Sequence, residues 1–428
     1  MTSEPDDGKH VGLIDKGQAT GVGVSALFSA AVSYVVLVIA AHTLPPNDNA
    51  IFLAYWALLF GTFGVLTGLN SEAARASFMG ERTCAPRYPV LVPVAIACAT
   101  FACALLGASG FGWANRVLDG EHAWLVGIVV AAGIAFSGHL AVTGVLAGRG
   151  QWHGLILATV CEASVRMACV VLALLAFDTL VGMALASAVS AAAWLLLLGR
   201  RDVRKAMRAR GDALLRRQIG NFAHACAASA SSAALIVGFP VLIRLTTDST
   251  TYLESAGLLL AIALTRAPLM VPLNAYQGVA LNYFLRHRHE GVRALWPIIG
   301  AVLGVTAVAA SAAAVVGPTI FSLLLGGRYS VGAWLLAGLT VGAGLLALVT
   351  VTGACCLAVG GHRTYAVGWL VATVVAVLVL MLPVDLQVRT VLSLLVAPLC
   401  GASVHVVSIR SATGRAVDPV TGARRETS

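Results

Sequence analysis

Three ionisable residues lie inside long apolar segments of the sequence, where a charge needs a partner. Glu162 and Arg166 occur in VCEASVRMACV, and Arg266 occurs in LTRAPLMVPL. A charged side chain deep in hydrocarbon costs about 2.5–3.5 kcal/mol on insertion scales, so such a residue usually faces protein or water. Guanidinium groups bind anionic groups such as phosphate through paired hydrogen bonds and stay protonated. We therefore expect Arg166 and Arg266 to face a central cavity and bind an anion.

A structural role is the alternative for the same residues. Glu162 and Arg166 are four residues apart, so they share one helix face and can pair along it. We expect Glu162 to be a partner for Arg166 rather than an ion site. Arg266 can instead reach toward the membrane surface or bind carbonyl groups freed by Pro268 and Pro272. The sequence leaves both readings open.

Polar side chains also gather where several expected helices end on the cytoplasmic side. They could form an inner mouth of the cavity, but helix ends near lipid headgroups are commonly polar. Both interpretations stay open for this set, which comprises Asn70, Glu72, Arg75, Arg149, Asn221, His224 and Asn282.

No group of residues points to catalysis or to a cofactor. The chain has nine cysteines but no CxxC pair, and no spacing of its histidines suits a metal. A Walker-type phosphate loop is also missing from the sequence. The longest expected outer connection, 317–330, is short for an enzyme that acts on lipid-linked sugars. We expect neither an enzyme nor a metal or cofactor site.

The elements that must position these residues are transmembrane helices. Of 428 residues, 59% are hydrophobic and 11% are charged, with a mean hydropathy of +0.88. That is too little charge for the surface of a soluble protein, whereas apolar blocks of about twenty residues can cross a bilayer as helix. About twelve spans are predicted, and the second is expected to continue past residue 69. They lie near 20–43, 50–69, 88–108, 122–143, 154–176, 179–199, 220–244, 253–276, 295–316, 331–356, 364–383 and 388–409.

The placement of basic residues predicts the orientation of these spans. With the N-terminus in the cytoplasm, the outer connections hold only Arg116, Arg244, Arg328 and Arg389, and most other basic residues fall in inner segments. The net charge of +9 therefore indicates membrane orientation rather than a nucleic-acid partner. We read the first apolar run as a permanent span rather than a secretory signal, and we expect both termini in the cytoplasm.

The basic segment 200–218 (RRDVRKAMRARGDALLRRQ) divides the chain into two sets of six spans. It would orient the halves at the anionic cytoplasmic face, with lipid-regulated gating as the alternative. Short echoes, such as Leu69-Asn70 with Leu273-Asn274, indicate duplication. We therefore expect an all-α membrane protein with two six-helix lobes related by a pseudo-twofold axis along the membrane normal. Its expected parts are a cytoplasmic tail at 1–19, an N-lobe at 20–199, the linker at 200–218, a C-lobe at 219–409 and a cytoplasmic tail at 410–428.

Three stretches of the sequence resemble a known family. GVLAGRGQWHGLILATVCEASVR (144–166), LTRAPLMVPLNAYQGVALNYF (264–284) and ACCLAVGGHRTYAVGWL (354–370) resemble segments of bacterial oligosaccharide flippases. These proteins are a branch of the multidrug/oligosaccharidyl-lipid/polysaccharide exporter superfamily. The residues that match the family pattern by position are Arg149, Glu162, Arg166, Arg266 and Gln277. Trp152 replaces the usual Phe, and Asn274 lies in a stretch that is more apolar in the family.

The resemblance implies a flippase of the bacterial plasma membrane that works by alternating access. Its cargo would be a sugar or oligosaccharide on polyprenyl phosphate, for cell-wall or surface polysaccharide synthesis. Membrane lipids and glycosyltransferases of the pathway would be its partners. The substrate site would comprise Glu162, Arg166, Arg266, Asn274 and Gln277.

Two other functions remain open. A multidrug or cation antiporter of the same fold is the first alternative. It would need an acidic residue free to take up protons or sodium, whereas Glu162 is expected to be paired. A non-transporting membrane scaffold for cell-wall enzymes is the second alternative.

Overall fold

The computed structural model describes residues 16–82, 88–110, 112–176, 179–266, 283–284, 288–358 and 361–417. These residues are almost entirely helical, and the β-bridge found among them pairs Pro89 with Arg210. The expected all-α class is therefore confirmed. The helices in chain order are α1 (Lys16–Thr43), α2 (Pro46–Arg82), α3 (Leu91–Ser109), α4 (Trp113–Val117), η1 (Gly120–His122), α5 (Leu125–Gly148), α6 (Trp152–Ala176), α7 (Leu180–Val189), η2 (Ser190–Leu197), α8 (Arg201–Met207), α9 (Leu215–Ile236), α10 (Phe239–Thr246), α11 (Ser249–Leu253), the helix Ala256–Arg266, η3 (Arg288–Leu295), α13 (Trp296–Val315), α14 (Gly317–Leu324), α15 (Ala333–Ala358), α16 (His362–Leu380) and α17 (Leu386–Val417).

The described helices include many that can span a membrane. Ten are long and apolar enough, and the bent pair α9 and α10 would make an eleventh span. The helix Ala256–Arg266 falls in the eighth predicted span (253–276), which the structure describes only up to residue 266. As expected, α2 continues well past residue 69, to Arg82. The chain is a multi-pass helical membrane protein, while the side on which its termini lie stays a prediction.

Two predicted spans are not straight α-helices. The sixth (179–199) begins as α7 and continues as the 3₁₀ helix η2. The seventh (220–244) is broken after Ile236, where α9 and α10 meet at an angle of 66°. Pro240 lies in the first turn of α10, and in a continuous helix its ring would crowd the carbonyl of Ile236, which favours a kink or a break there.

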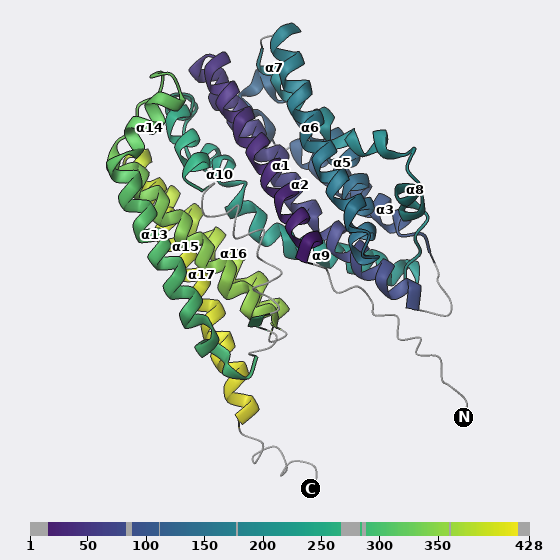
Figure 1. Cartoon of the computed structure of the whole chain (residues 1–428). Helices are drawn as coiled ribbons and strands as arrows, with labels where there is room; N and C mark the ends of the chain where they lie inside the picture. Colours follow the sequence, from purple (N-terminus) through teal and green to yellow (C-terminus); the bar gives the residue numbers. More distant parts are fainter. Residues whose placement is uncertain are drawn as a thin grey trace, which may run out of the picture.

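Figure 1 shows the helices in two groups. The first group holds α1, α2, α3, α5 and α6, and the second holds α13, α15, α16 and α17, with α9 and α10 between them. The start of α1 and the end of α17 lie toward the lower end of this view. Helix α9 packs against α2 and α3 of the first group and against α16 of the second. It is therefore an element that both groups share.

Helix α9 approaches α2 closely because α2 presents glycines to it. Gly61, Gly64 and Gly68 form this glycine face of α2. A Cβ atom at Gly68 would lie 2.4 Å from the backbone carbon of Ala225, and one at Gly64 would lie 3.0 Å from the Cβ of Ala233. Helices in membranes associate through close packing of small residues because lipid supplies no hydrophobic driving force between them. The glycine face thus brings the two backbones into contact.

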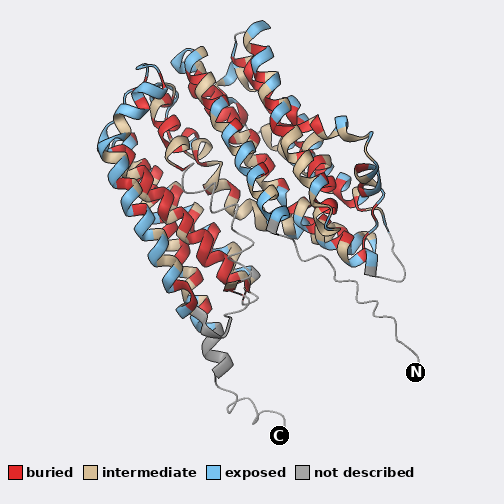
Figure 2. Ribbon diagram, viewed as in Figure 1, coloured by how far each residue is buried: buried red, intermediate tan, exposed pale blue. Residues whose placement is uncertain are grey.

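The outward faces of the helices carry large apolar side chains. Leu172, Leu175, Val308, Val315 and Leu323 are between 63% and 83% exposed, and Figure 2 shows exposed residues along the outer edge of α13. An apolar surface of this extent marks membrane interaction. It agrees with helices that present these faces to lipid chains.

The segment between η2 and α9 packs against the first helix group. Backbone N–H groups of Val90 and Gly211 donate to the carbonyl oxygens of Ala209 (2.8 Å) and Tyr88 (2.9 Å). Helix α8 packs on α5. Arg200 donates two hydrogen bonds to Asp202 and holds the pKa of that carboxyl below its usual range. The predicted linker is therefore fixed to the first half of the protein.

Polar contacts join the two helix groups at the end of the molecule near α14. Asn49, at the start of α2, donates to the hydroxyl of Tyr329 at 3.0 Å. Arg328 donates to the carbonyl oxygens of His42 (2.8 Å) and Leu44 (3.3 Å), at and just after the end of α1. Carbonyl groups at a helix C-terminus lack intrahelical donors and carry partial negative charge. These contacts close this end of the molecule.

Removing these contacts is expected to favour a state that is open at this end. The double variant Arg328→Ala/Tyr329→Phe loses the three hydrogen bonds, worth about 1 kcal/mol each, so the open population should rise on the order of a hundredfold. The readout is the rate at which an impermeant thiol reagent labels Leu53→Cys, a cavity position on α2, in a cysteine-free background. Arg116→Ala, at an exposed arginine, is the control. Equal labelling rates in all variants would show that these contacts do not hold the end closed.

Candidate functional site

A cavity of about 300 Å³ lies between α1 and α2 on one side and α9, α10 and the helix Ala256–Arg266 on the other. Its walls are mostly apolar and aromatic, and Arg266 is the one charged residue among the described residues that line it. The lining residues that matter below are Ser33, Tyr34, Trp56, Phe60, Pro240 and Arg266. The cavity therefore lies between the first helix group and the shared elements α9 and α10, and its described lining carries positive charge.

Arg266 is deeply buried, with 7% of its surface exposed. Its Nη1 donates to the carbonyl oxygens of Ile236 at 2.7 Å and Leu235 at 3.4 Å. Its guanidinium carbon lies 5.1 Å from the ring centroid of Phe239. The Nη2 atom has no hydrogen-bond partner among the described residues. Since buried donors are rarely left unpaired, this atom marks a place where an acceptor can bind.

The carbonyl groups that Arg266 binds are free because of the bend between α9 and α10. In a continuous helix, the carbonyl of Ile236 would accept from the N–H of residue 240, and Pro240 has no N–H. Arg266 supplies the missing donor. An arginine bound to carbonyls freed by a proline was one of the two expected arrangements, but the proline is Pro240. Pro268 and Pro272 lie outside the described residues.

Arg166 and Glu162 form a buried ion pair on α6, with 3% and 4% of their surfaces exposed. Arg166 also donates to the hydroxyl of Ser33 on α1 and lies 4.9 Å from the ring centroid of Phe60 on α2. Ser190 of η2 donates to the same Glu162 oxygen at 3.0 Å. The pair thus joins four elements of the first helix group.

Among the described residues, the two arginines do not line the same cavity. Arg266 lines it, whereas Arg166 does not, because Glu162 and Ser33 bind its guanidinium. Ser33 and Phe60 line the cavity and also contact Arg166. The expectation that both arginines face a central passage must therefore be restricted to Arg266, with Arg166 supporting the wall of the cavity.

Several residues expected at an inner mouth connect helices. Asn70 donates to Thr143 at 2.9 Å and to a backbone carbonyl of α5 at 3.1 Å. Glu72 accepts two hydrogen bonds from Arg75, at 2.6 and 2.7 Å, and Arg75 also donates to Asp212 at 3.1 Å. These three residues therefore join α2 to α5 and to the linker.

The remaining residues of that set lie in different surroundings. Arg149 forms an ion pair with Glu81 at 2.7 Å and donates to the carbonyl of Lys205 at 3.3 Å. Asn221 is half-buried on α9. His224 is exposed there, with Nδ1 2.7 Å from a carbonyl of its own helix. Three other predicted residues lie outside the described part of the chain: Asn274, Gln277 and Asn282.

Sequence reasoning missed the aromatic wall of the cavity and the glycine face of α2. Both come from one stretch, AYWALLFGTFGVLTG (54–68). Trp56 and Phe60 are four residues apart, so they share a helix face. Gly64 and Gly68 have the GxxxG spacing typical of close helix packing in membranes. The signal was present, but it does not say which helix lies opposite.

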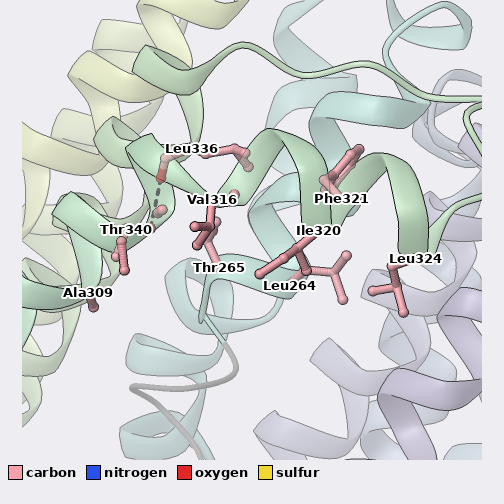
Figure 3. Close-up of a pocket in the computed structure, with 12 residues that line it drawn as sticks. Leu264, Thr265, Ala309, Val316, Ile320, Phe321, Leu324, Leu336 and Thr340 are labelled. Carbon is pink, nitrogen blue, oxygen red and sulfur yellow. Dashed lines mark hydrogen bonds between the residues drawn. The ribbon is translucent and has the colours of Figure 1, made fainter.

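A second hollow, of about 330 Å³, lies behind the helix Ala256–Arg266 and is drawn in Figure 3. Leu264 and Thr265 line it together with residues of α13, α14 and α15. Its two threonine hydroxyls donate to carbonyls of their own helices, Thr265 to Ala261 and Thr340 to Leu336, both at 2.7 Å. Its described lining offers no free polar group that could orient a ligand, so the cavity at Arg266 is the candidate site. In the described residues, no group of three or more His, Cys, Asp or Glu side chains could hold a metal ion.

The arrangement of helices is similar to that of known transporters. An inward-facing multidrug resistance MATE family transporter of the MOP superfamily matches with a TM-score of 0.67 and 14% identity, over 94% of this chain and 97% of that chain. An outward-facing MATE structure matches with a TM-score of 0.65 and 14% identity, over 93% and 96%. A MOP superfamily transporter from Pyrococcus furiosus matches with a TM-score of 0.64 and 16% identity, over 92% and 96%. The chain therefore has the fold of the MOP superfamily transporters.

Relatives in sequence define the family more narrowly. No protein-family model matches the chain. The uncharacterized protein Rv3630 of Mycobacterium tuberculosis is 35% identical over 419 residues, which cover 94% of each chain. The uncharacterized protein Rv1510 of the same species is 34% identical over 424 residues, covering 96% of this chain and 95% of that protein. The chain belongs to the family of these mycobacterial proteins.

Proposed function

We propose that this protein is an alternating-access transporter of a bacterial plasma membrane that moves an anionic amphiphile from one leaflet to the other. The cargo we propose is a sugar or oligosaccharide linked to polyprenyl phosphate. The observation that carries the proposal is the buried guanidinium of Arg266, whose Nη2 has no partner among the described residues and which lines the cavity next to α9 and α10. The MOP fold and the resemblance to oligosaccharide flippases support it.

The charge of the headgroup is the physical obstacle to its crossing. A phosphate loses its hydration in hydrocarbon, and the cost of an unpaired charge there is large. A guanidinium compensates through charge-assisted hydrogen bonds, worth about 1.5–3 kcal/mol each, and it stays protonated. A polyprenyl chain needs no such help and can remain among lipids. A cavity of about 300 Å³ is at the lower end of ligand pockets, which suits a phosphate headgroup better than a whole oligosaccharide.

A multidrug transporter is the second candidate, and the comparisons support it at least as well. The matching MATE structures are described as multidrug resistance transporters. A cation-coupled antiporter needs an acidic group that can exchange its ion, whereas Glu162 accepts hydrogen bonds from Arg166 and Ser190. The Pyrococcus furiosus protein is described as having a binding pocket of reverse polarity that suggests a different function. Here Arg266 makes the described lining positive, which favours an anion.

Binding of a short polyprenyl phosphate separates these candidates. We expect farnesyl phosphate to bind the purified protein in nanodiscs and Arg266→Gln to weaken binding at least tenfold, because it removes one or more charge-assisted hydrogen bonds. Affinity is measured by isothermal titration calorimetry. Arg116→Gln, at an exposed arginine, is the matched control and should bind like the wild type.

Three other outcomes would change the assignment. Binding of the cationic dye ethidium without binding of farnesyl phosphate would favour a multidrug transporter. A folded Arg266→Gln protein that fully replaces the wild type in its host would favour a scaffold. Depletion of the protein should make one lipid-linked glycan accumulate in the cytoplasmic leaflet, and an unchanged lipid profile would refute the flippase.

A further inference from the structure

The cavity and the bend between α9 and α10 share one side chain. Nη1 of Arg266 binds the carbonyls at the end of α9, while Nη2 of the same guanidinium is buried without a partner among the described residues, and Arg266 lines the cavity. Pro240 lines the cavity and removes the N–H that would otherwise bind the carbonyl of Ile236. A ligand in the cavity and the end of α9 therefore compete for the same donors.

The geometry points to Arg266 as the sensor of an α9–α10 hinge, centred on Val237 and Gly238. This inference rests on the proposed function, since it requires an anionic headgroup in the cavity. A phosphate that binds a guanidinium bidentately uses two of its nitrogens. Binding through both η nitrogens takes Nη1 away from Leu235 and Ile236. The end of α9 then loses the donor that replaces its missing backbone hydrogen bond, and the 66° bend is released.

The position of the hinge explains how a local change would move whole helix groups. Helix α9 packs against α2, α3 and α16, and α10 packs against α2, α4 and α16. Arg244 of α10 is 3.4 Å from Asp119 of the first half and 5.0 Å from the ring centroid of Tyr252. Both helices thus contact elements from each half, so the angle between them sets how the halves stand relative to one another.

The hinge is testable through the distance between spin labels on its two arms. Ala227 on α9 and Leu245 on α10 are exposed and can carry labels in a cysteine-free background. The protein is kept in nanodiscs, and the probe is farnesyl diphosphate. We expect the probe to shift the distance distribution of the wild type, whereas farnesol, which has the same chain and no phosphate, leaves it unchanged.

Two variants separate the sensor from the hinge. In Arg266→Gln, the distribution should already be shifted without probe and should not respond to it. In Pro240→Ala, the restored N–H can bind Ile236, so the bend should straighten and stop responding. The guanidinium of Arg266 then no longer has to bind the carbonyl of Ile236 as well as the probe, so the probe should bind up to tenfold more tightly. Pro318→Ala removes the proline from the first turn of α14, which does not line the cavity at Arg266, and should behave like the wild type.

The outcomes distinguish this inference from the function on which it rests. Bound farnesyl diphosphate without a shift of the distances, or a normal response in Pro240→Ala, would overturn the sensor while leaving the cargo intact. Failure of the probe to bind the wild type would refute the proposed cargo, and the sensor with it. In that case, a distance distribution of Arg266→Gln that equals that of the wild type would also show that Arg266 does not hold the bend.

Discussion

Replacing Arg166 with methionine is expected to lower the free energy of unfolding by about 3–5 kcal/mol, because it leaves the buried carboxylate of Glu162 without its cationic partner. Glu162 is 4% exposed and, of its hydrogen-bond donors in the described part of the chain, would keep the hydroxyl of Ser190. Methionine fills a comparable length of apolar space, so the loss of charge pairing dominates. The measurement is thermal and denaturant unfolding of the purified protein in detergent.

The double variant Glu162→Leu/Arg166→Met is the control for this prediction. Removing both charges avoids the unpaired carboxylate, and replacement of a buried ion pair by apolar residues is often neutral or stabilising. We expect the double variant to recover most of the lost stability and to bind farnesyl phosphate within a few-fold of the wild type. An Arg166→Met protein of normal stability that no longer binds the phosphate would instead place Arg166 in the substrate site.

Substituting Gly68 with valine is expected to prevent the close approach of α2 and α9. Even the Cβ of alanine would lie 2.4 Å from backbone atoms of Ala225 and Cys226, so a helix rather than a side chain must move. Overpacking typically costs about 1–3 kcal/mol and sometimes more, and we expect Gly68→Val to exceed this range and Gly68→Ala to fall within it. Yield of monodisperse protein and its unfolding midpoint give the measurement.

Gly23 of α1 provides the matched control, because a Cβ atom there would meet nothing within 4 Å. Alanine at an open helical position should be neutral or stabilise by about 0.5–1 kcal/mol. A Gly68→Val protein as stable as the wild type would mean that α9 does not rest on the glycine face of α2.

Hydropathy was sufficient to predict the helical membrane fold and most of the spans. Spans such as 295–316 and 331–356 correspond closely to α13 and α15, because an apolar block of this length has few alternatives in a membrane. The bend in 220–244 was not predicted, since Pro240 can also occur in a straight helix whose freed carbonyl finds another donor. In this structure the donor to the freed carbonyl is Arg266, which lies 26 residues after Pro240. The sequence alone does not show that Arg266 meets the carbonyl of Ile236.

The candidate site was predicted in its residue types but only partly in its geometry. The burial of Glu162, Arg166 and Arg266 follows from their apolar neighbours, and the pairing of Glu162 with Arg166 follows from their spacing. The orientation of Arg166 depends on Ser33 and Phe60, which lie on other helices far away in sequence. No local pattern encodes such contacts, so Arg166 and Arg266 could not be told apart from sequence.

The attachment of the linker determines where the polypeptide could be cut without harm. Its backbone pairs with the segment before α3, and Asp212 binds Arg75, so the segment up to Asp212 completes the first half. The polypeptide then connects the two halves through the short segment 213–214, between Asp212 and the start of α9 at Leu215. A protease acting there would leave two complete fragments held together by helix packing, whereas a cut at Gly199 would separate α8 from the half that it stabilises.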